Sequence, residues 1–217
     1  KMKKLVAVVP ARSFDEVLKN KNILSFGNSN LLVNKVKQLK KVDLIDEVLV
    51  SSDSKKYLDL VKSEDIIIDH RPIEFAALDS NFGDFVEYIC SKVNANHILW
   101  ASPTSPLVNS DDFSSAINKY FEIINNGYDS LISVNKIKRH MLDDNGPLNF
   151  RFKNSLRNNE KLPTLYEFTN GIVIAPRLSM IKWRYNWGFH PFKLEMNHIK
   201  IVDICNEWEY KFANFLK

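Results

Sequence analysis

The sequence predicts an α/β fold with a mostly parallel sheet and helices on both faces. Short apolar runs, each ended by polar or turn residues, alternate along the chain with stretches whose apolar residues recur at helical spacing. Such runs are typical of buried parallel strands, and the alternation favours a sheet covered by helices. The 217 residues, 45% hydrophobic and 26% charged, suit one globular domain over residues 1–217.

The apolar runs predict the positions of the strands. The first run, Leu-Val-Ala-Val-Val, stops at Pro10, and another contains three consecutive isoleucines at residues 66–68. Strands are expected at residues 5–9, 47–51, 65–69, 97–101 and 129–134. The pattern returns at residues 171–175 and 199–204, which places Asp203 at the end of the last expected strand.

Helical spacing predicts the segments between the strands. Leu31, Leu32, Val36 and Leu39 recur at helical spacing within residues 30–40. Ser54 is the expected N-cap of a short helix over residues 54–62. Further helices are expected at residues 81–93, 111–125 and 206–215.

Residues 135–169 interrupt this alternation. The stretch is polar, has few long apolar runs and contains several basic residues, among them Lys136, Lys138, Arg139 and Arg151. We expect a hairpin-like excursion or flap there, within the single domain.

The charge balance favours a small anionic ligand. The net charge is +4 and basic residues adjoin only in pairs, which is poor support for a nucleic-acid face. The two cysteines, Cys90 and Cys205, form no zinc or disulfide pattern, so a cytoplasmic location is expected. No apolar stretch approaches the ~18 residues of a membrane span, so no membrane partner is expected.

Basic residues directly follow the first expected strand. Arg12, Lys19, Lys21 and Asn22 belong to the polar loop after residues 5–9. Ligands of open α/β sheets bind just beyond the carboxyl ends of the strands, and guanidinium and ammonium groups suit phosphate charge. The loop is interpreted as an anion site, with a solvated surface loop as the alternative.

Other strand ends carry further candidates. Arg71 follows the third expected strand, either as a ligand contact or as a surface arginine. Thr104 and Ser105 belong to a proline-stiffened loop whose hydroxyls can donate to a ligand, unless it is an ordinary turn. Asp203 is a candidate Mg²⁺ ligand, because Mg²⁺ is usually held by one or two carboxylates plus substrate phosphates. The alternative is an acid that complements a helix dipole.

Several short motifs occur in one order along the chain. They are Val9-Pro10-Ala11-Arg12, Lys21-Asn22, Ser51-Ser52-Asp53, Arg71-Pro72, Pro103-Thr104-Ser105-Pro106-Leu107, Asn170-Gly171 and Val202-Asp203-Ile204. In these motifs the chain resembles the acylneuraminate cytidylyltransferases, also called CMP-sialic acid synthetases. The resemblance implies a Rossmann-like fold, an excursion that mediates homodimer formation, and transfer of CMP from CTP to a sugar acid with Mg²⁺ and release of pyrophosphate.

The resemblance also implies roles for particular residues. The nucleotide would be bound by Ala11, Arg12, Lys21, Asn22, Arg71 and Ser80. The sugar would be bound by Ser102, Thr104, Ser105 and Asn170. Arg12, Lys21 and Asp203 would act in catalysis, with Asp203 as the metal ligand.

The chain departs from the family pattern at several of these motifs. Glu16 stands where the family has a lysine, Ser102 where it has glutamine, Phe168 where it has arginine, and Cys205 where it has a second metal carboxylate. Two functions therefore stay open. One is a cytidylyltransferase acting on a sialic-acid-like sugar, and the other is a degenerate member that binds a nucleotide or a partner without catalysis.

Overall fold

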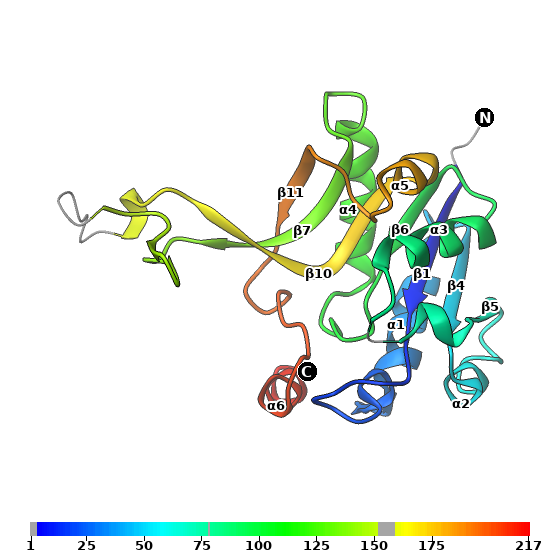
Figure 1. The fold of residues 1–217 in the computed structure, drawn as a ribbon. Coiled ribbons are helices and arrows are strands. Elements are labelled where there is room, and N and C mark those ends of the chain that lie inside the picture. The colour runs from blue at the N-terminus through cyan, green and yellow to red at the C-terminus, as the bar shows by residue number, and fades with distance from the viewer. Residues whose placement is uncertain (1–3, 78, 152–158) are drawn as a thin grey trace.

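The computed structural model describes residues 4–77, 79–151 and 159–217, and a seven-stranded sheet forms its centre (Figure 1). Its strands pair in the order β11 (Pro191–Glu195), β7 (Ser130–Ile137), β10 (Leu165–Pro176), β6 (His97–Trp100), β1 (Leu5–Pro10), β4 (Glu47–Ser52) and β5 (Ile67–His70). β10 is antiparallel to β6 and β7, and the other neighbours are parallel. The mostly parallel sheet expected from the sequence is confirmed.

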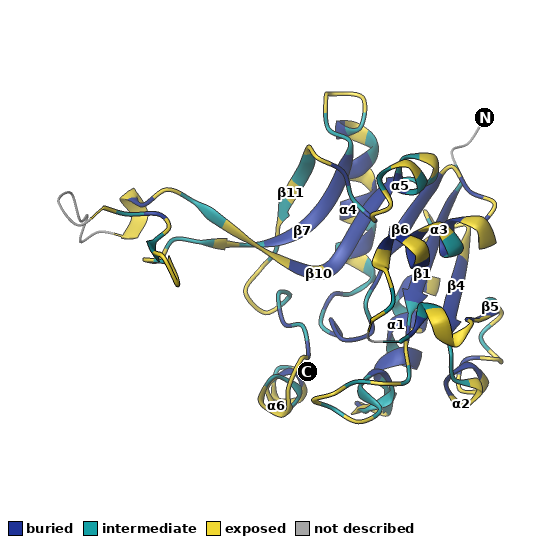
Figure 2. Cartoon of the chain, viewed as in Figure 1, coloured by how far each residue is buried: buried dark blue, intermediate teal, exposed yellow. Residues whose placement is uncertain are grey.

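Helices cover both faces of this sheet. They are α1 (Leu31–Lys40), α2 (Lys55–Asp59), α3 (Phe82–Lys92), α4 (Ser110–Ile123) and α5 (Arg177–Trp183), whereas α6 (Glu207–Phe215) lies away from the sheet and packs in a separate small core. The side chains of β1 alternate between two cores, as the period of a strand requires. Leu5, Ala7 and Val9 face α1, α2 and α4, while Val6 and Val8 face α3 and α5. Figure 2 shows the resulting buried centre.

Asparagine side chains begin four of the helices. Asn30, Asn81, Asn109 and Asn206 each accept a backbone N–H of the first turn of α1, α3, α4 or α6, which satisfies donors that the helix leaves free. Ser54 occupies the N-cap position of α2, but its side chain makes no cap bond and α2 ends at Asp59. Residues 60–63 continue as turns instead of a helix, although Val61 is buried in the same core as Tyr57 and Leu58.

The prediction of a last strand over residues 199–204 is wrong. Residues 199–204 form a turn and an irregular segment, and the strand beside β7 is β11, which the sequence pattern did not indicate. Val202 and Ile204 instead pack with Phe26 and Ala213 in a small separate core. Asp203 therefore lies in an irregular segment, not at the end of a strand.

The excursion is a two-stranded arm. The outer parts of β7 and β10 pair antiparallel from Leu165–Ile137 to Phe168–Val134 and project away from the sheet (Figure 1). A small hairpin, β8 (Leu142–Asp143) with β9 (Gly146–Pro147), follows β7. Residues 152–158 of the expected excursion lie outside the described residues. No helix in the described part of the chain is long and apolar enough to span a bilayer.

Candidate functional site

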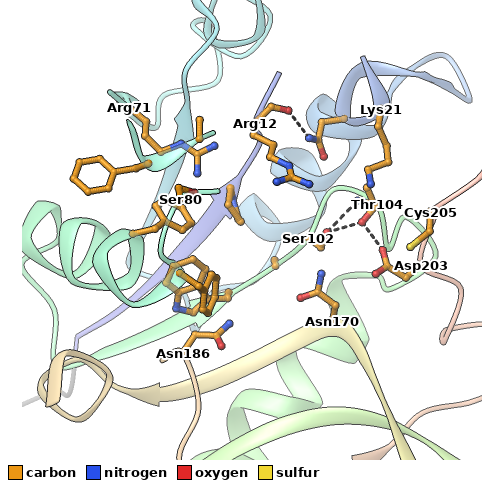
Figure 3. A pocket seen from close by; sticks show the side chains of 18 residues that line it. Arg12, Lys21, Arg71, Ser80, Ser102, Thr104, Asn170, Asn186, Asp203 and Cys205 are labelled. Carbon is orange, nitrogen blue, oxygen red and sulfur yellow. Dashed lines mark hydrogen bonds between the residues drawn. The ribbon is translucent and has the colours of Figure 1, made fainter. Parts of the chain in front are cut away.

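A cavity of about 510 Å³ lies at the carboxyl ends of β1 and β6, beside the segment that follows β5 (Figure 3). It is lined by most of the residues expected at the site. These are Arg12, Lys21, Asn22, Arg71, Ser80, Ser102, Thr104, Asn170 and Asp203. Parallel strands bring their carboxyl ends to one edge, which explains why loops far apart in the sequence meet here.

Two expected site residues are not among those that line the cavity. The side chain of Ala11 is fully buried in the core that faces α1, and its N–H donates to the Ser51 carbonyl over 2.9 Å. Ser105 is buried, and its carbonyl accepts a hydrogen bond from Lys35 over 2.9 Å. Both residues shape the loops that carry cavity residues.

The loop after β1 is folded around its own polar groups. The buried Asn22 donates from Nδ2 to the Arg12 carbonyl over 2.9 Å, which ties the two ends of the loop together. Figure 3 shows the Arg12 guanidinium facing the cavity. Lys21 forms an ion pair with Asp15 over 2.6 Å. Burial by itself would raise the pKa of Asp15. Hydrogen bonds from Lys21 and from the Leu18 and Val17 N–H groups outweigh burial and hold this pKa below its ordinary value.

The carboxylate beside Lys21 is therefore Asp15 rather than Glu16. Glu16 is exposed and does not line the cavity. Asp15 is held in place by the backbone N–H groups of Val17 and Leu18 at 3.1 and 3.0 Å. Part of the charge of Lys21 is thus already neutralised within the chain.

Arg71 is a buried cation that faces the cavity. Its residue exposure is 4%, its Cζ atom lies 4.4 Å from the centre of the Phe85 ring, and Asp53 approaches it at 4.0 Å. Both Asp53 carboxylate oxygens bond to Ser13. The Nε and Nη2 atoms of Arg71 have no hydrogen-bond partner among the described residues. Because unpaired buried donors are costly, they mark a place for acceptor atoms of a ligand.

Asp203 is held by residues about a hundred positions earlier in the chain. Its Oδ1 accepts from the Thr104 hydroxyl, which is also 2.7 Å from Ser102 Oγ. The Ile204 N–H donates to the Thr104 carbonyl over 2.8 Å. Burial raises the pKa of Asp203, while Thr104, Lys21 and Asn170 oppose this rise. A positive charge on a ligand, or a bound metal ion, would keep the Asp203 carboxylate ionised.

The residues around Asp203 fit a magnesium ion that is shared with a phosphorylated ligand. No group of three potential metal-binding side chains occurs in the described ranges. Glu209 is engaged with the N–H groups of Cys205 and Asn206 at 2.6 and 3.1 Å. Asp203 is thus the one carboxylate that lines the described cavity. A single carboxylate suffices for Mg²⁺ where phosphate oxygens and waters complete the coordination.

A bulge in β10 delivers Asn170. The pairing with β7 shifts between Phe168 and Val173, and Asn170 takes a left-handed backbone with φ 56°. Ser133 fills the bulge, since its hydroxyl accepts from both Thr169 Oγ1 and the Ile172 N–H over 2.8 Å. Bulges of this kind re-aim a side chain, and Figure 3 shows the Asn170 carboxamide facing the cavity.

The buried Lys35 of α1 holds the loop after β6 in place through hydrogen bonds to its carbonyl groups. It is fully buried, donates from Nζ to the carbonyls of Ser105 and Val108 over 2.9 and 3.0 Å, and lies 4.9 Å from the Phe113 ring centre. Gln38 adds a bond to the Pro106 carbonyl. Burial lowers the pKa of Lys35 to about 7.

Sequence reasoning missed the aromatic side of the cavity. Phe75, Phe82, Phe85 and Trp100 line it, together with Asn186. The available signal was the pair Phe82 and Phe85 in the first turn of α3, three positions apart and directly after the expected nucleotide residue Ser80. Asn186 follows α5 in no recognisable motif.

Cationic side chains around a cavity at the carboxyl edge of a mostly parallel sheet define an α/β protein with a site suited to an anionic ligand. A family model described as cytidylyltransferase matches residues 6–213. The chain therefore belongs to the cytidylyltransferase family, as its motifs led us to expect.

Individual known proteins are more distant. The N-acylneuraminate cytidylyltransferase of Escherichia coli is 23% identical over 216 residues, which are 97% of this chain and 51% of that protein. A two-part protein of Helicobacter pylori, whose first-named activity is pseudaminic acid cytidylyltransferase, is 38% identical over 58 residues, 27% of this chain and 11% of that protein. The chain thus spans about half the length of the first of these relatives and less of the second.

A solved structure shows the same fold. The CMP:2-keto-3-deoxy-manno-octonic acid synthetase complexed with CTP superimposes with a TM-score of 0.68 at 13% identity, over 98% of both chains. The Rossmann-like α/β class expected from the sequence is thereby confirmed.

Proposed function

We propose that this protein transfers CMP from CTP to a sialic-acid-like sugar acid and releases pyrophosphate. The observation that carries the proposal is the arrangement of three cations, Arg12, Lys21 and Arg71, around one cavity that also contains Asp203. Family membership supports the nucleotide. The names of the two curated relatives support a sugar acid as acceptor.

The reaction needs a nucleophile, a leaving group and charge stabilisation. A hydroxyl oxygen of the sugar acid forms a bond to the α-phosphorus of CTP and gives up its proton to water, while the bond from that phosphorus to the bridging oxygen breaks and its electron pair leaves with pyrophosphate. Negative charge grows on the transferred group and on pyrophosphate, where Arg12 and Lys21 stabilise it. The unpaired donors of Arg71 bind acceptor atoms of the nucleotide, and the fixed cavity orients both reactants.

Asp203 is the residue that holds Mg²⁺ in this proposal. Magnesium supplies further charge stabilisation to the triphosphate. Thr104 keeps the carboxylate of Asp203 oriented toward the cavity through its hydroxyl.

The arm formed by β7 and β10 is proposed to build a homodimer. Its outer part exposes Tyr166, and the hairpin after β7 exposes Leu142; a second copy would cover such apolar surface. Light scattering at micromolar concentration is expected to give twice the monomer mass. A monomeric mass would refute this assembly.

The test of the proposed function compares two basic residues on opposite sides of the same fold. Pyrophosphate release is measured with CTP, Mg²⁺ and sialic-acid-like sugars, and CTP affinity by calorimetry. Arg12→Ala is expected to weaken CTP binding about 10-fold or more. Lys40→Ala, which removes an exposed lysine bonded to the Glu64 carbonyl, is expected to change neither value. Equal affinities for the two variants would refute the role of the loop.

A second candidate, nucleotide binding without turnover, is favoured by one observation. Asp15 already neutralises part of the Lys21 charge. CTP binding with no pyrophosphate release from any acceptor would support this candidate over the enzyme.

A further inference from the structure

We propose that Lys35 and Gln38 of α1 are positioning residues, which hold the loop after β6 so that Thr104 keeps Asp203 directed into the cavity. The proposal rests on the proposed function, because it concerns the support of the Asp203 site. Neither side chain lines the cavity, so both act through the loop. We call these two residues the α1 clamp.

Several carbonyl groups of this loop are bonded to side chains of α1. Lys35 Nζ donates to the carbonyls of Ser105 and Val108 over 2.9 and 3.0 Å. Gln38 Nε2 donates to the Pro106 carbonyl over 2.9 Å. All three loop residues are buried, and a buried carbonyl that loses its donor is costly. Without the α1 clamp, the loop would have to move until water or another donor reached these groups.

Hydrogen bonds within the loop are longer than those to α1. The Ser105 N–H donates to the Ser102 carbonyl over 3.3 Å, and the Val108 N–H donates to the Ser105 carbonyl over 3.4 Å. Both exceed the usual range of about 2.7 to 3.2 Å. Pro103 and Pro106 have no N–H to donate. The conformation of the loop therefore depends more on the α1 clamp than on its own backbone.

The same loop carries the contacts to Asp203. The Thr104 hydroxyl donates to the Asp203 carboxylate, and the Thr104 carbonyl accepts from the Ile204 N–H over 2.8 Å. A Cβ atom at Gly171 would lie 3.1 Å from the Val108 side chain, so the bulge of β10 also packs directly on this loop. Because closely packed interiors transmit strain, a displacement of the loop would reach both the carboxylate and the bulge.

The surroundings of Lys35 suit a lysine. Its side chain has no exposed surface, and its Nζ atom lies 4.9 Å from the centre of the Phe113 ring, a favourable place for an ammonium group. Two carbonyls require two N–H groups, and the amino group has them with or without its third proton. The alternative is a purely structural role, in which Lys35 stabilises the fold without affecting the cavity.

The experiment compares two buried residues of the same helix. Lys35→Met keeps the length of the side chain and removes its donors. Leu39→Ala is the matched control, because Leu39 is fully buried in the same core and its side chain can bond no carbonyl. Both substitutions are expected to lower the free energy of unfolding. Only Lys35→Met is expected to loosen the loop.

Amide hydrogen exchange measures the loop directly. In Lys35→Met, exchange of the Ile204 N–H is expected to accelerate at least ~10-fold more than exchange of the β1 amides, since it opens locally. In Leu39→Ala the two are expected to accelerate alike. Equal acceleration at Ile204 and in β1 of Lys35→Met would show a purely structural role and overturn the proposal.

Turnover and CTP binding are measured on the folded variants. In Lys35→Met, kcat for pyrophosphate release is expected to fall about 10-fold or more, because a misplacement of about 1 Å can cost 10²-fold. KM for CTP, and CTP affinity without Mg²⁺, are expected to stay close to the wild-type values, since Arg12 and Arg71 lie on other segments. Leu39→Ala is expected to keep both kcat and KM. An unchanged kcat in Lys35→Met would overturn the proposal.

A double-mutant cycle locates the action of Lys35. Thr104→Val removes the hydroxyl that bonds to Asp203. If Lys35 acts through Thr104, the two substitutions are strongly non-additive, and Lys35→Met reduces kcat little further in the Thr104→Val background. Additive losses would refute this path of action.

Gln38→Leu decides the question if Lys35→Met does not fold. It removes one bond to the Pro106 carbonyl, where Asn34 Nδ2 remains 3.4 Å away. A fall in kcat of a few-fold, with locally faster exchange at Ile204, is therefore expected. Wild-type values of both quantities in Gln38→Leu would overturn the proposal.

The α1 clamp can be tested apart from the proposed function. If the wild type releases no pyrophosphate from any acceptor, the transfer reaction is refuted. The gain in CTP affinity on addition of Mg²⁺ then replaces kcat as the measured quantity. This gain is expected to be smaller in Lys35→Met than in Leu39→Ala, because Asp203 is displaced only in the former. An equal gain in the two variants would overturn the role of the α1 clamp.

Discussion

The two ends of the cavity differ in charge and in the part of the sheet that builds them. At the cationic end, Arg12, Lys21 and Arg71 come from segments that follow β1 and β5, in the parallel half of the sheet. At the aromatic end, a second hollow adjoins the cavity, and of the residues that line it Phe168 lies on the antiparallel strand β10 and Tyr185 follows α5. Asp203 lies between the two ends.

This difference corresponds to the two reactants of the proposed reaction. The triphosphate is the constant reactant, and the acceptor is the one that can vary. A triphosphate always requires positive charge, and the carboxyl ends of parallel strands provide positions for it. The acceptor end is built from a bulged strand and a loop after a helix, which tolerate changes of side chain without loss of the sheet. We therefore expect substitutions at one end to affect the nucleotide and substitutions at the other end to affect the acceptor.

The largest expected effect is at Asp203, where the two ends meet. Asp203→Asn keeps an acceptor for Thr104 but removes the charge that would hold Mg²⁺. The rate of pyrophosphate release is expected to fall about 10²–10³-fold, while CTP binding without Mg²⁺ is not weakened, because a negative charge beside the triphosphate is removed. Glu207→Gln is the control, because Glu207 is exposed at the start of α6 and pairs with Lys211. Full activity of Asp203→Asn would remove Asp203 from the mechanism.

Arg71 sharpens the assignment of the cationic end. Arg71→Ala removes the buried donors that have no partner in the described part of the chain, and CTP affinity is expected to fall about 10–10²-fold, as for a hydrogen-bonded charged group. Arg71→Lys keeps the charge and loses the planar fork, so only partial rescue is expected. Calorimetry with CTP checks both. Undiminished affinity in Arg71→Ala would mean that the nucleotide lies elsewhere.

Lys35 tests the loop that carries Ser102 and Thr104 between the two ends. Burial lowers the pKa of Lys35 to about 7 against 10.5 for the free side chain, although Asp112 and Asp203 oppose the shift and Lys200 adds to it. Between these two pH values the unfolded chain holds a proton that the folded chain has released. Folding stability therefore rises with pH in this window, by up to about 1.4 kcal/mol per pH unit.

The substitution Lys35→Met is expected to abolish this increase of folding stability with pH. The difference in unfolding free energy between wild type and Lys35→Met is expected to grow from pH 7 to pH 9 in denaturant titrations. Lys37→Met, on the same helix and largely exposed, is expected to show a constant difference. A constant difference for Lys35→Met as well would show that Lys35 is charged in the folded protein throughout this range.

The smallest effect is expected at Asp15, within the cationic end. Asp15→Asn removes the partner that lies 2.6 Å from the Lys21 ammonium, so more positive charge is available to phosphate. CTP affinity is expected to increase a few-fold, because Lys21 is only partly buried and solvent screens the gain. Weaker CTP binding in Asp15→Asn would show instead that Asp15 orients Lys21.

The cationic end was largely predictable from the sequence. An apolar run that stops at a proline shows where a buried strand ends, and Arg12, Lys21 and Arg71 follow such runs directly. These patterns are local, so they can be recognised in the sequence without knowledge of strand pairing. The resemblance in short motifs added the nucleotide, and the family match confirmed that reading.

The remaining features depend on contacts between distant parts of the chain. Residues 199–204 have the apolar alternation of a strand, but Val202 and Ile204 satisfy it by packing on Phe26 and Ala213, and β11 takes the place beside β7. Alternation of apolar residues indicates that side chains are buried, but it does not indicate which segment of the chain buries them.

The sequence by itself determined the parallel core of the sheet and the cations at its edge, because both follow from local runs of apolar residues and what comes after them. Only the tertiary structure decided that Asp15 neutralises Lys21, that Thr104 holds Asp203 across 99 positions, and that Phe82, Phe168 and Tyr185 line one hollow. These arrangements are set by strand order, a bulge and helix packing, whose energies arise between segments that no local pattern connects.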